Sequence, residues 1–442
     1  MGHTTAVTVS DAPLKPDIGV WGALSLGVGG IVGGGFFATF GLAIVSARGA
    51  TYVSFLLGGL VALLTVYSYV RLTIRYPGPG GTVDYVRLGL GNGVVAASVN
   101  VLLILSYVAV MAVYARALAA YSVSTLPEGD RELWMHIVGS LAIILLGVIN
   151  YAGAALMTKF EDVFNLGKLS LLGIFVAAGF LLGKPDWTRL GTSQWASPAT
   201  IVSSGMLVFL SYEGFELISN ASPRIRNPRT TLPIAFYGSV FTALAIYMLA
   251  SVVAVGHISF SAAEQARDFA LSATAARFLG PVGFGMMACA AVFASASAIN
   301  ADFFGAEKLP VMLGEHFELP SLFDRKVRGR SVVSMACIGA LALLALNLLS
   351  LHALSAVTSG GFLIVYAAVN FANFKLANQT GARSWISALA AVSCIAAIVL
   401  MIVQFMSTPG GRESAWAIIA VVLLSVLIEV SFRAYRRGAL SP

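Results

Sequence analysis

Two carboxylates lie close together in FLSYEGFELISN, residues 209–220 of this 442-residue chain. Glu213 and Glu216 stand on either side of Gly214, well inside a hydrophobic segment that starts near residue 198. If this segment crosses a membrane, each acid is costly unless it is satisfied, and its short side chain cannot reach the surface. We therefore expect these carboxylates to serve a function.

A second unusual stretch, LGVGGIVGGGFF at residues 26–37, is rich in glycine. Glycine destabilises a helix interior by about 1 kcal/mol relative to alanine, so the cluster from Gly29 to Gly35 favours local unwinding. Unwinding frees backbone amides at the start of the next half-helix, whose positive dipole end attracts a carboxylate. Alternatively, glycines four residues apart in this cluster allow close packing between helices.

A single basic residue, Lys168, lies in the apolar stretch FNLGKLSLLGIFVAAGF, residues 164–180. Burial disfavours the ammonium form, so a lysine at this depth can take up and release protons. The alternative is a side chain that extends to the inner membrane surface, near Glu161 or Asp162.

The elements that must position these residues are membrane helices. The chain is 58% hydrophobic and only 11% charged, with a mean hydropathy of +0.86, which indicates a protein that crosses the lipid bilayer many times. We expect an all-α fold, because twelve apolar runs are close to the roughly 20 residues that a crossing needs. The predicted spans are 18–45, 50–75, 93–122, 135–155, 160–183, 198–219, 232–256, 281–305, 331–350, 352–375, 384–407 and 413–433.

The loops predict the orientation of these spans. Most of the 27 Lys and Arg residues fall on the inner side if both termini are cytoplasmic, which places the chain in the cell (inner) membrane. The net charge of +7 then reflects topology, and no nucleic-acid partner is expected. Residues 1–17 lack a signal peptide's charged start and cleavage site, so we expect a short cytoplasmic tail there and another at 434–442.

The positions of the two unusual stretches predict an internal repeat. They fall in the first and sixth spans, as expected if 18–183 and 198–375 are inverted repeats that each open with a broken helix. Residues 384–433 then supply two further helices. The isolated cysteines and scattered histidines have no spacing typical of a metal or redox site, so no metal or cofactor is expected.

Four ordered motifs resemble those of the amino acid/polyamine/organocation (APC) transporter superfamily, particularly its bacterial amino acid permeases. They are GVGGIVGGGFF at 27–37, RYPGPGGTVDYV at 75–86, YEGFELISNASPRIRNPRTTLPIAF at 212–236 and SASAINADFFGAEKLPVML at 295–313. The resemblance implies a fold of five plus five inverted helices with two further helices.

The resemblance also implies a substrate site at the two interrupted helices. Its expected members are Ile31, Gly33, Gly34, Gly35, Phe209, Leu210, Glu213 and Gly214. Backbone amides of the first-helix glycines would bind the carboxylate of an amino acid, and freed carbonyls of both helices would bind its ammonium group. We expect Phe209 and Glu216 to contribute to gating.

Lys168 matches a lysine that, in proton-coupled members of the superfamily, occupies the space where sodium-coupled relatives bind sodium. The resemblance therefore implies H⁺ as the coupling ion and no sodium site at Lys168. The groups expected to accept hydrogen bonds from its ammonium lie on the first and eighth helices, at Gly27, Val28, Ser295 and Ser297.

Two positions depart from the family pattern. Arg71 on the second helix and Arg224 after the sixth stand where the family usually has glutamate. Either the ion network at the inner mouth differs, or these arginines are solvated on the inner surface. On the eighth helix Asp302, Glu307 and Lys308 lie toward the inner end, where we expect Glu307 to form a boundary ion pair with Lys308 or Arg325 rather than a site.

We therefore expect a secondary active transporter that moves an amino acid or related amine by alternating access and proton symport. An enzyme is not expected, because HExxH and GxSxG motifs are lacking, and a channel is disfavoured because no filter motif occurs. Two alternatives stay open: an exchanger without proton coupling, in which Lys168 is a fixed charge, and a sensor on the same fold. No oligomeric state is assigned.

Overall fold

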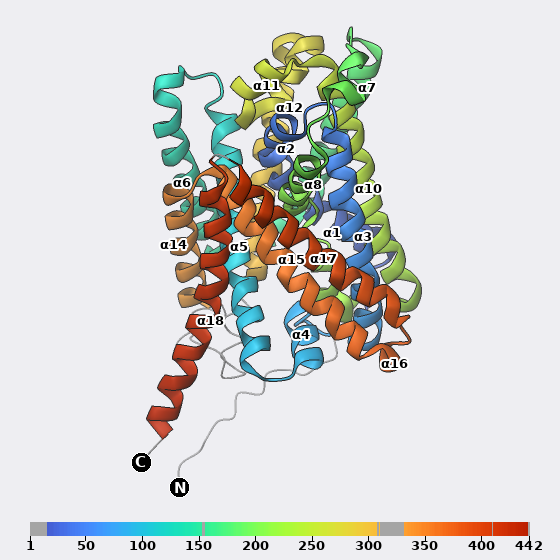
Figure 1. The fold of residues 1–442 in the computed structure, drawn as a ribbon, viewed down its shortest axis with the longest axis vertical. Coiled ribbons are helices and arrows are strands. Elements are labelled where there is room, and N and C mark those ends of the chain that lie inside the picture. Colours follow the sequence, from blue (N-terminus) through green and yellow to red (C-terminus); the bar gives the residue numbers. More distant parts are fainter. Residues whose placement is uncertain (1–15, 153–154, 307–308, 310–330, 409, 441–442) are drawn as a thin grey trace.

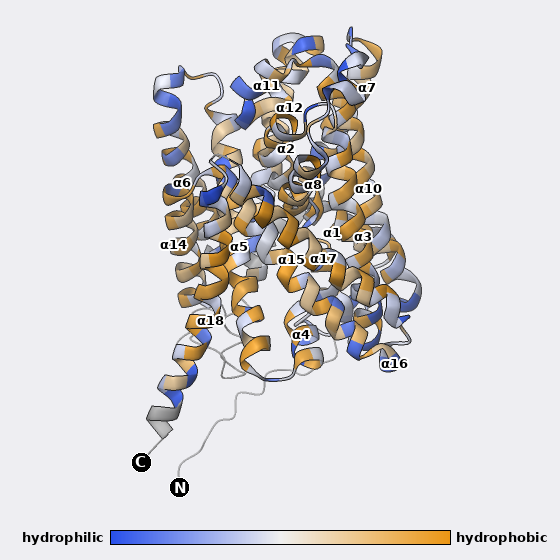
Figure 2. Ribbon diagram, viewed as in Figure 1, coloured by the Kyte–Doolittle hydropathy of each residue, from blue (hydrophilic) through white to orange (hydrophobic). Residues whose placement is uncertain are grey.

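The computed structural model describes residues 16–152, 155–306, 309, 331–408 and 410–440. Its long helices run side by side along one axis (Figure 1). Figure 2 shows apolar residues along the middle of these helices, with hydrophilic residues gathered near their ends. Ten of the described helices are long and apolar enough to cross a membrane, or eleven if one bent pair counts as a span. These features confirm an all-α polytopic membrane protein.

Each predicted span corresponds to a helix or to a broken helix. In chain order these are α1 (Val20–Ile31) with α2 (Gly34–Ala47), α3 (Thr51–Arg75), α5 (Val94–Ser122), α6 (Glu128–Ala152), α7 (Ala155–Leu181), α8 (Pro198–Leu207) with η3 (Val208–Tyr212) and α9 (Leu217–Asn220), α10 (Pro228–His257), α12 (Ala270–Ala306), α14 (Val332–Leu348), α15 (Leu351–Lys375), α17 (Ser384–Ser407) and α18 (Arg412–Leu440). Because α14 has only 17 residues, the arrangement with twelve crossings stays a prediction.

Short helices lie between the long ones. They are α4 (Thr82–Leu90), η1 (Trp187–Leu190), η2 (Thr192–Gln194), η4 (Ser222–Arg224), α11 (Phe260–Gln265), η5 (Arg267–Phe269) and α16 (Ala377–Thr380). In Figure 1, α4, α16 and the C-terminal part of α18 lie at one end of the molecule, and α11 and the start of α6 lie at the other. The connecting segments therefore lie at both ends of the molecule, as expected of a chain that crosses a membrane repeatedly.

Local signals in the sequence set several helix boundaries. The side chains of Ser197 and Ser350 each accept a hydrogen bond, at 3.2 Å, from a backbone amide in the first turn of α8 and α15. The element α12 consists of two helical segments, because Gly280 (φ 63°, ψ −152°) is not helical. The second segment starts at Pro281, where the predicted span starts, and a separate helical segment from Ala270 precedes it.

The interior of the protein is formed by the broken spans and the helices around them. In the span Pro198–Asn220, 89% of the most apolar window is buried, compared with 22% in α18 and 28% in α6. The least buried of these spans are α18, α6 and the part of α7 at Phe164–Leu181, with 33% buried, so these helices lie toward the outside of the protein. The two interruptions predicted from the sequence lie at the centre of the protein.

Candidate functional site

The first broken span bends by 46° between α1 and α2. Only Val32 (φ −79°, ψ 63°) and Gly33 (φ −101°, ψ −159°) leave the helix, whereas Gly29 and Gly30 stay helical. The predicted interruption is thus confirmed but is shorter than the glycine cluster. No side chain caps the N-terminus of α2 in the described structure, so the first amides of α2 lack this kind of partner.

The sixth span is interrupted over a longer stretch, which confirms the second predicted break. The helix α8 continues into η3, after which Glu213 is extended, with φ −63° and ψ 151°. Gly214 has φ 110°, a backbone conformation that residues other than glycine rarely adopt. Helical structure resumes at Leu217.

The two breaks contact each other backbone to backbone. A Cβ atom added at Gly214 would lie 2.5 Å from the carbonyl carbon of Gly30, and one added at Gly30 would lie 2.8 Å from the Gly214 oxygen. A Cβ atom at Gly29 would lie 2.4 Å from Nδ2 of Asn165. Gly29 and Gly30 therefore serve close packing, and Gly33 serves the break.

Side chains from α10 and α15 hold both breaks in place. The hydroxyl of Tyr247 lies 2.9 Å from the Ile31 carbonyl oxygen and 3.0 Å from that of Ser211. Ser359 Oγ accepts a hydrogen bond from the Leu210 amide at 3.1 Å and donates one to the Leu207 carbonyl at 2.7 Å. The Leu210 carbonyl accepts the Glu213 amide at 3.2 Å, so the predicted carbonyl ligands Ile31 and Leu210 already have protein partners in this conformation.

Glu216 fixes the geometry of the second break. Its side chain is buried and accepts three hydrogen bonds, from the Tyr107 hydroxyl at 2.9 Å, the Tyr366 hydroxyl at 2.8 Å and the Gly214 amide at 2.9 Å. These donors come from α5, from α15 and from the break itself. The carboxylate therefore ties two helices to the interrupted span, and its role in gating stays a prediction.

A small cavity lies between the two breaks and has an acidic lining. Its glycine and polar lining residues are Gly29, Gly30, Tyr114, Glu213, Gly214, Ser297 and Asp302. Its volume is about 20 Å³, enough for one water molecule, so the described conformation is closed around the site. Tyr114 donates a hydrogen bond to Glu213 Oε2 at 2.8 Å.

Asp302 is a residue of this cavity that the motifs of the sequence do not identify. Its position predicts a place toward the inner end of the eighth helix, but it is 5% exposed and lines the cavity together with Glu213. Its Oδ2 atom has no hydrogen-bond partner among the described residues. The available signal was an acid in the apolar run ASASAINADFF, at a position where a buried charge is costly. The predicted ion pair of Glu307 with Lys308 lies outside the described residues, as do residues 1–15 of the tail.

Lys168 reaches the first break from α7. Its side chain is 1% exposed, and its ammonium nitrogen donates to the Gly29 carbonyl oxygen at 2.8 Å. This position contradicts the alternative in which the side chain extends to the membrane surface. The acceptor lies one residue beyond Val28, whose own carbonyl accepts the Val32 amide at 2.9 Å.

The other predicted residues lie in tightly packed surroundings. A Cβ atom added at Gly34 would lie 2.7 Å from Ser295 Oγ. One added at Gly35 would lie 2.6 Å from Leu210 Cδ1, and one added at Gly27 would lie 2.6 Å from Ile218 Cδ1. Phe209 is fully buried, with its ring centroid 5.9 Å from that of Tyr366. Side chains therefore fill the space beside the first turn of α2 in this closed conformation.

The two family departures differ in their surroundings. Arg224 binds Asp17, with Nη2 and Oδ2 2.5 Å apart, and holds the pKa of that carboxyl below its ordinary value through this hydrogen bond. Backbone bonds join the same segments, since the amides of Asp17 and Ile18 each donate to the Arg224 carbonyl at 3.0 Å. Arg71 lies with its guanidinium carbon 5.5 Å from the centre of the Tyr67 ring. Arg224 thus forms an ion pair with the segment before α1.

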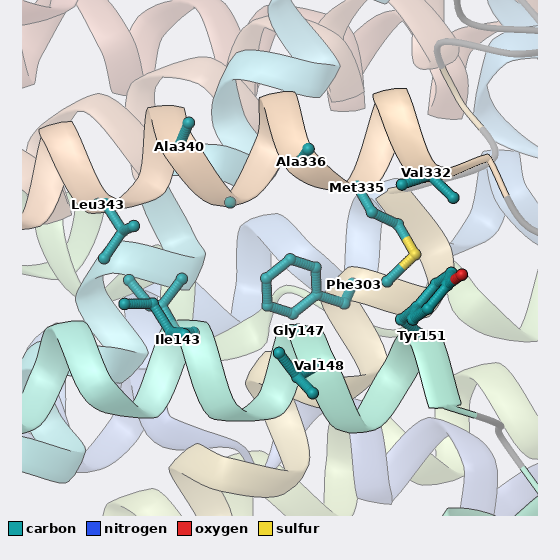
Figure 3. Close-up of a pocket in the computed structure, with 12 residues that line it drawn as sticks. Ile143, Gly147, Val148, Tyr151, Phe303, Val332, Met335, Ala336, Ala340 and Leu343 are labelled. Carbon is teal, nitrogen blue, oxygen red and sulfur yellow. The ribbon is translucent and has the colours of Figure 1, made fainter. Parts of the chain in front are cut away.

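A larger cavity, of about 340 Å³, lies between α6 and α14 on the outside of the protein. Figure 3 shows apolar side chains, among them Ile143, Phe303, Met335 and Leu343, pointing into it. Its lining contains no acidic or basic side chain. This surface therefore offers nothing to bind a charged molecule. The interior cavity is the candidate functional site because it lies between the two interrupted spans.

Comparisons with known proteins agree with this geometry. Residues 18–428 match the family described as Amino acid permease. The inner membrane transport protein YbaT of Escherichia coli (strain K12) is 31% identical over 417 residues, which cover 94% of this chain and 96% of the relative. The uncharacterized protein MJ0609 of Methanocaldococcus jannaschii is 27% identical over 416 residues, covering 94% and 95%. Cationic amino acid transporter 9, chloroplastic, of Arabidopsis thaliana is 24% identical over 344 residues, covering 73% and 59%.

Proposed function

Because the chain belongs to the amino acid permease family, we propose that it moves an amino acid across the cytoplasmic membrane by alternating access, coupled to protons. The family and the apolar helices make the chain a multi-pass membrane transporter of a small molecule, not an enzyme. The observation that carries the finer proposal is the meeting of two interrupted spans at Gly30 and Gly214, beside an acidic cavity. Interrupted helices in opposed repeats are typical of substrate sites in secondary transporters.

The packing of the long helices supports two inverted repeats, 18–183 and 198–375. The helix α5 packs on α15 as α12 packs on α7, and α1 packs on α10 as α8 packs on α3. If spans one to five correspond in order to spans six to ten, each contact in such a pair corresponds to the other. With α4, α16 and the end of α18 on the cytoplasmic side, the lysine and arginine distribution follows the positive-inside rule.

The proposed substrate site spans the first break. The first amides of α2, at Gly34 and Gly35, and its positive dipole end would bind the carboxylate of the amino acid. Carbonyls at Ile31 and near Glu213 would bind its ammonium group. Because Tyr247 and other side chains occupy this space in the closed conformation, they must move when the substrate enters.

The proposed coupling residue is Lys168. When it is protonated, its hydrogen bond to the Gly29 carbonyl is charge-assisted and holds α1 against α7 at the break. Loss of the proton would weaken this bond and allow α1 to move. Protonation and the position of the first broken helix are then linked.

The test is to replace Lys168 with alanine in proteoliposomes with an inward proton gradient. We expect Lys168→Ala to bind the substrate but not to concentrate it. Lys375→Ala is the matched control, because Lys375 also donates to a glycine carbonyl, that of Gly89 at 3.1 Å, but outside the breaks. Full gradient-driven uptake by Lys168→Ala would disprove the coupling role.

An exchanger is the second candidate, because a buried, hydrogen-bonded Lys168 would also serve as a fixed positive charge. In that mechanism one amino acid moves inward while another, or a related amine, moves outward. Counterflow that is independent of a pH gradient would favour exchange over proton symport.

A further inference from the structure

The cavity between the breaks contains two carboxylates that recognition of a simple zwitterion does not need. We propose that Glu213 and Asp302 form a cation subsite, which selects a basic amino acid by the ammonium or guanidinium group of its side chain. This inference rests on the proposed function and names the substrate class of the same site.

Asp302 has a buried carboxylate oxygen that a ligand could satisfy. Its side chain is 5% exposed and lines the cavity, and Oδ2 lacks a hydrogen-bond partner among the described residues. Buried polar atoms in native proteins are nearly always hydrogen-bonded, and an unpaired buried carboxylate is costly. A donor group that enters the cavity would satisfy this oxygen.

The rest of the lining favours a cation as that donor. Glu213 faces the same cavity, and α1 contributes Gly29 and Gly30 near its C-terminus, the end that carries the negative partial charge of the helix dipole. Across the described part of the chain, neither Glu213 nor Asp302 forms an ion pair with a lysine, arginine or histidine. The ammonium group of Lys168 donates to the Gly29 carbonyl.

The cavity lies on the α1 side of the first break, which determines that the substrate side chain enters it. Its lining includes Gly29 and Gly30 of α1, but no residue of α2. The amides proposed to bind the substrate carboxylate belong to α2, on the other side of the break. In the proposed arrangement, the side chain of an amino acid bound there extends across the break into the cavity, toward Glu213 and Asp302.

The carboxylates of Glu216 and Glu213 differ in how many hydrogen bonds the protein donates to them. Glu216 is saturated by three donors and does not line the cavity, so its charge is already compensated by the protein. Glu213 has one donor at Oε2, the Tyr114 hydroxyl, which also lines the cavity. Glu429 on α18 is a buried acid outside both breaks and outside the cavity lining, so it serves as the control for substitutions at the subsite.

The experiment compares cationic and neutral ligands of nearly the same shape. Binding of lysine, norleucine, arginine, citrulline and cadaverine to the purified full chain is measured by thermal shift, and uptake of radiolabelled amino acids is measured in proteoliposomes. We expect lysine to bind at least about tenfold more tightly than norleucine, and arginine more tightly than citrulline. Asp302→Asn and Glu213→Gln should reduce these ratios about tenfold or more, whereas Glu429→Gln should leave them unchanged. Because the readout is a ratio, a general loss of folded protein does not change it.

The other outcomes separate this inference from the proposed function. Equal binding of lysine and norleucine by the wild type would overturn the cation subsite and leave transport of a neutral amino acid standing. Cadaverine bound as tightly as lysine would replace the basic amino acid with a diamine. An Asp302→Asn protein that keeps its preference but loses its dependence on the proton gradient would make Asp302 a proton carrier. Absence of binding and uptake for every amino acid would overturn the proposed function itself.

Discussion

The first and sixth spans are both interrupted, but the chain leaves the helix differently in each. In the first span two residues, Val32 and Gly33, break the helix, and neither has a polar side chain. In the sixth span Glu213 is extended and Gly214 has a positive φ, and two carboxylates lie within the break. The first break thus exposes backbone groups alone, whereas the second adds acidic side chains.

This difference suggests that the two breaks recognise different parts of the substrate. Backbone groups at the first break suit what every amino acid shares, a carboxylate and an ammonium group. Side chains at the second break suit what distinguishes one amino acid from another. Substitutions that affect the contact between the breaks should then abolish transport, and substitutions that affect only one break should change it selectively.

The largest effect is expected from Gly214→Ala. Alanine at φ 110° is strained, and its Cβ atom would lie 2.5 Å from the Gly30 carbonyl carbon. We expect a loss of about 3 kcal/mol or more in the free energy of unfolding, together with loss of uptake. Denaturant titration in detergent and proteoliposome uptake measure the two effects. Gly285→Ala is the matched control, because no atom lies within 4 Å of an added Cβ there, and a helical alanine should stabilise by up to about 1 kcal/mol. Similar stability of the two variants would contradict the contact.

The next largest effect is expected from Tyr247→Phe, which removes the hydroxyl shared by both breaks. The Ser211 carbonyl would lose its 3.0 Å contact, and the Ile31 carbonyl would keep only the Gly33 amide at 2.8 Å. We expect a loss of about 1 to 3 kcal/mol in stability. Tyr121→Phe serves as the control, because the hydroxyl of this equally buried tyrosine bonds to backbone outside both breaks, at Phe37 (3.4 Å) and at Leu271. Equal losses in the two variants would show that the bridge does not hold the breaks.

Ser359→Ala tests how much the hydrogen bond from the Leu210 amide to Ser359 stabilises the second broken span. It removes the acceptor of the Leu210 amide, so we expect a loss of about 1 kcal/mol in stability and a smaller loss in uptake. Ser355 lies one turn earlier on α15, is equally buried, and has an Oγ atom without a hydrogen-bond partner in the described structure. Ser355→Ala should therefore be neutral or slightly stabilising, and a reversed order of the two variants would contradict this role.

Much of the fold could be predicted from the sequence, because the signals involved are local. Long apolar runs define the helices, and the glycines and glutamates of the two breaks conflict with an uninterrupted helix in a membrane. The depth of Lys168 in an apolar run also predicted its burial. The extent of the first break was not predictable, because Gly29 and Gly30 stay helical for contacts with Asn165 and Gly214 that only the tertiary structure brings together.

The composition of the cavity was less accessible from the sequence. Asp302 is far from Glu213 along the chain, and its nearness to Glu307 and Lys308 suggested a helix boundary. Packing of α12 beside the breaks turns Asp302 toward the cavity, and a single sequence does not report that rotation. The bridging role of Tyr247 was hidden for the same reason, since a tyrosine in an apolar helix most often packs in the core.

The smallest effect is expected where the two broken spans are joined at their ends. Asp17 precedes α1 and Arg224 follows α9, and the guanidinium of Arg224 lowers the pKa of Asp17 by hydrogen bonding to its carboxylate. A lowered pKa means that the pair stabilises the fold above the unfolded-state pKa of Asp17, about 3.9, and loses this contribution as the pH falls through the folded-state value. The melting temperature of the wild type should therefore fall more steeply on acidification below about pH 4 than that of Asp17→Asn. Both side chains are half exposed, so high salt should bring the two curves together. Parallel curves at low salt would show that backbone pairing alone joins the two spans, and the ends of the breaks would then carry no charge-dependent link.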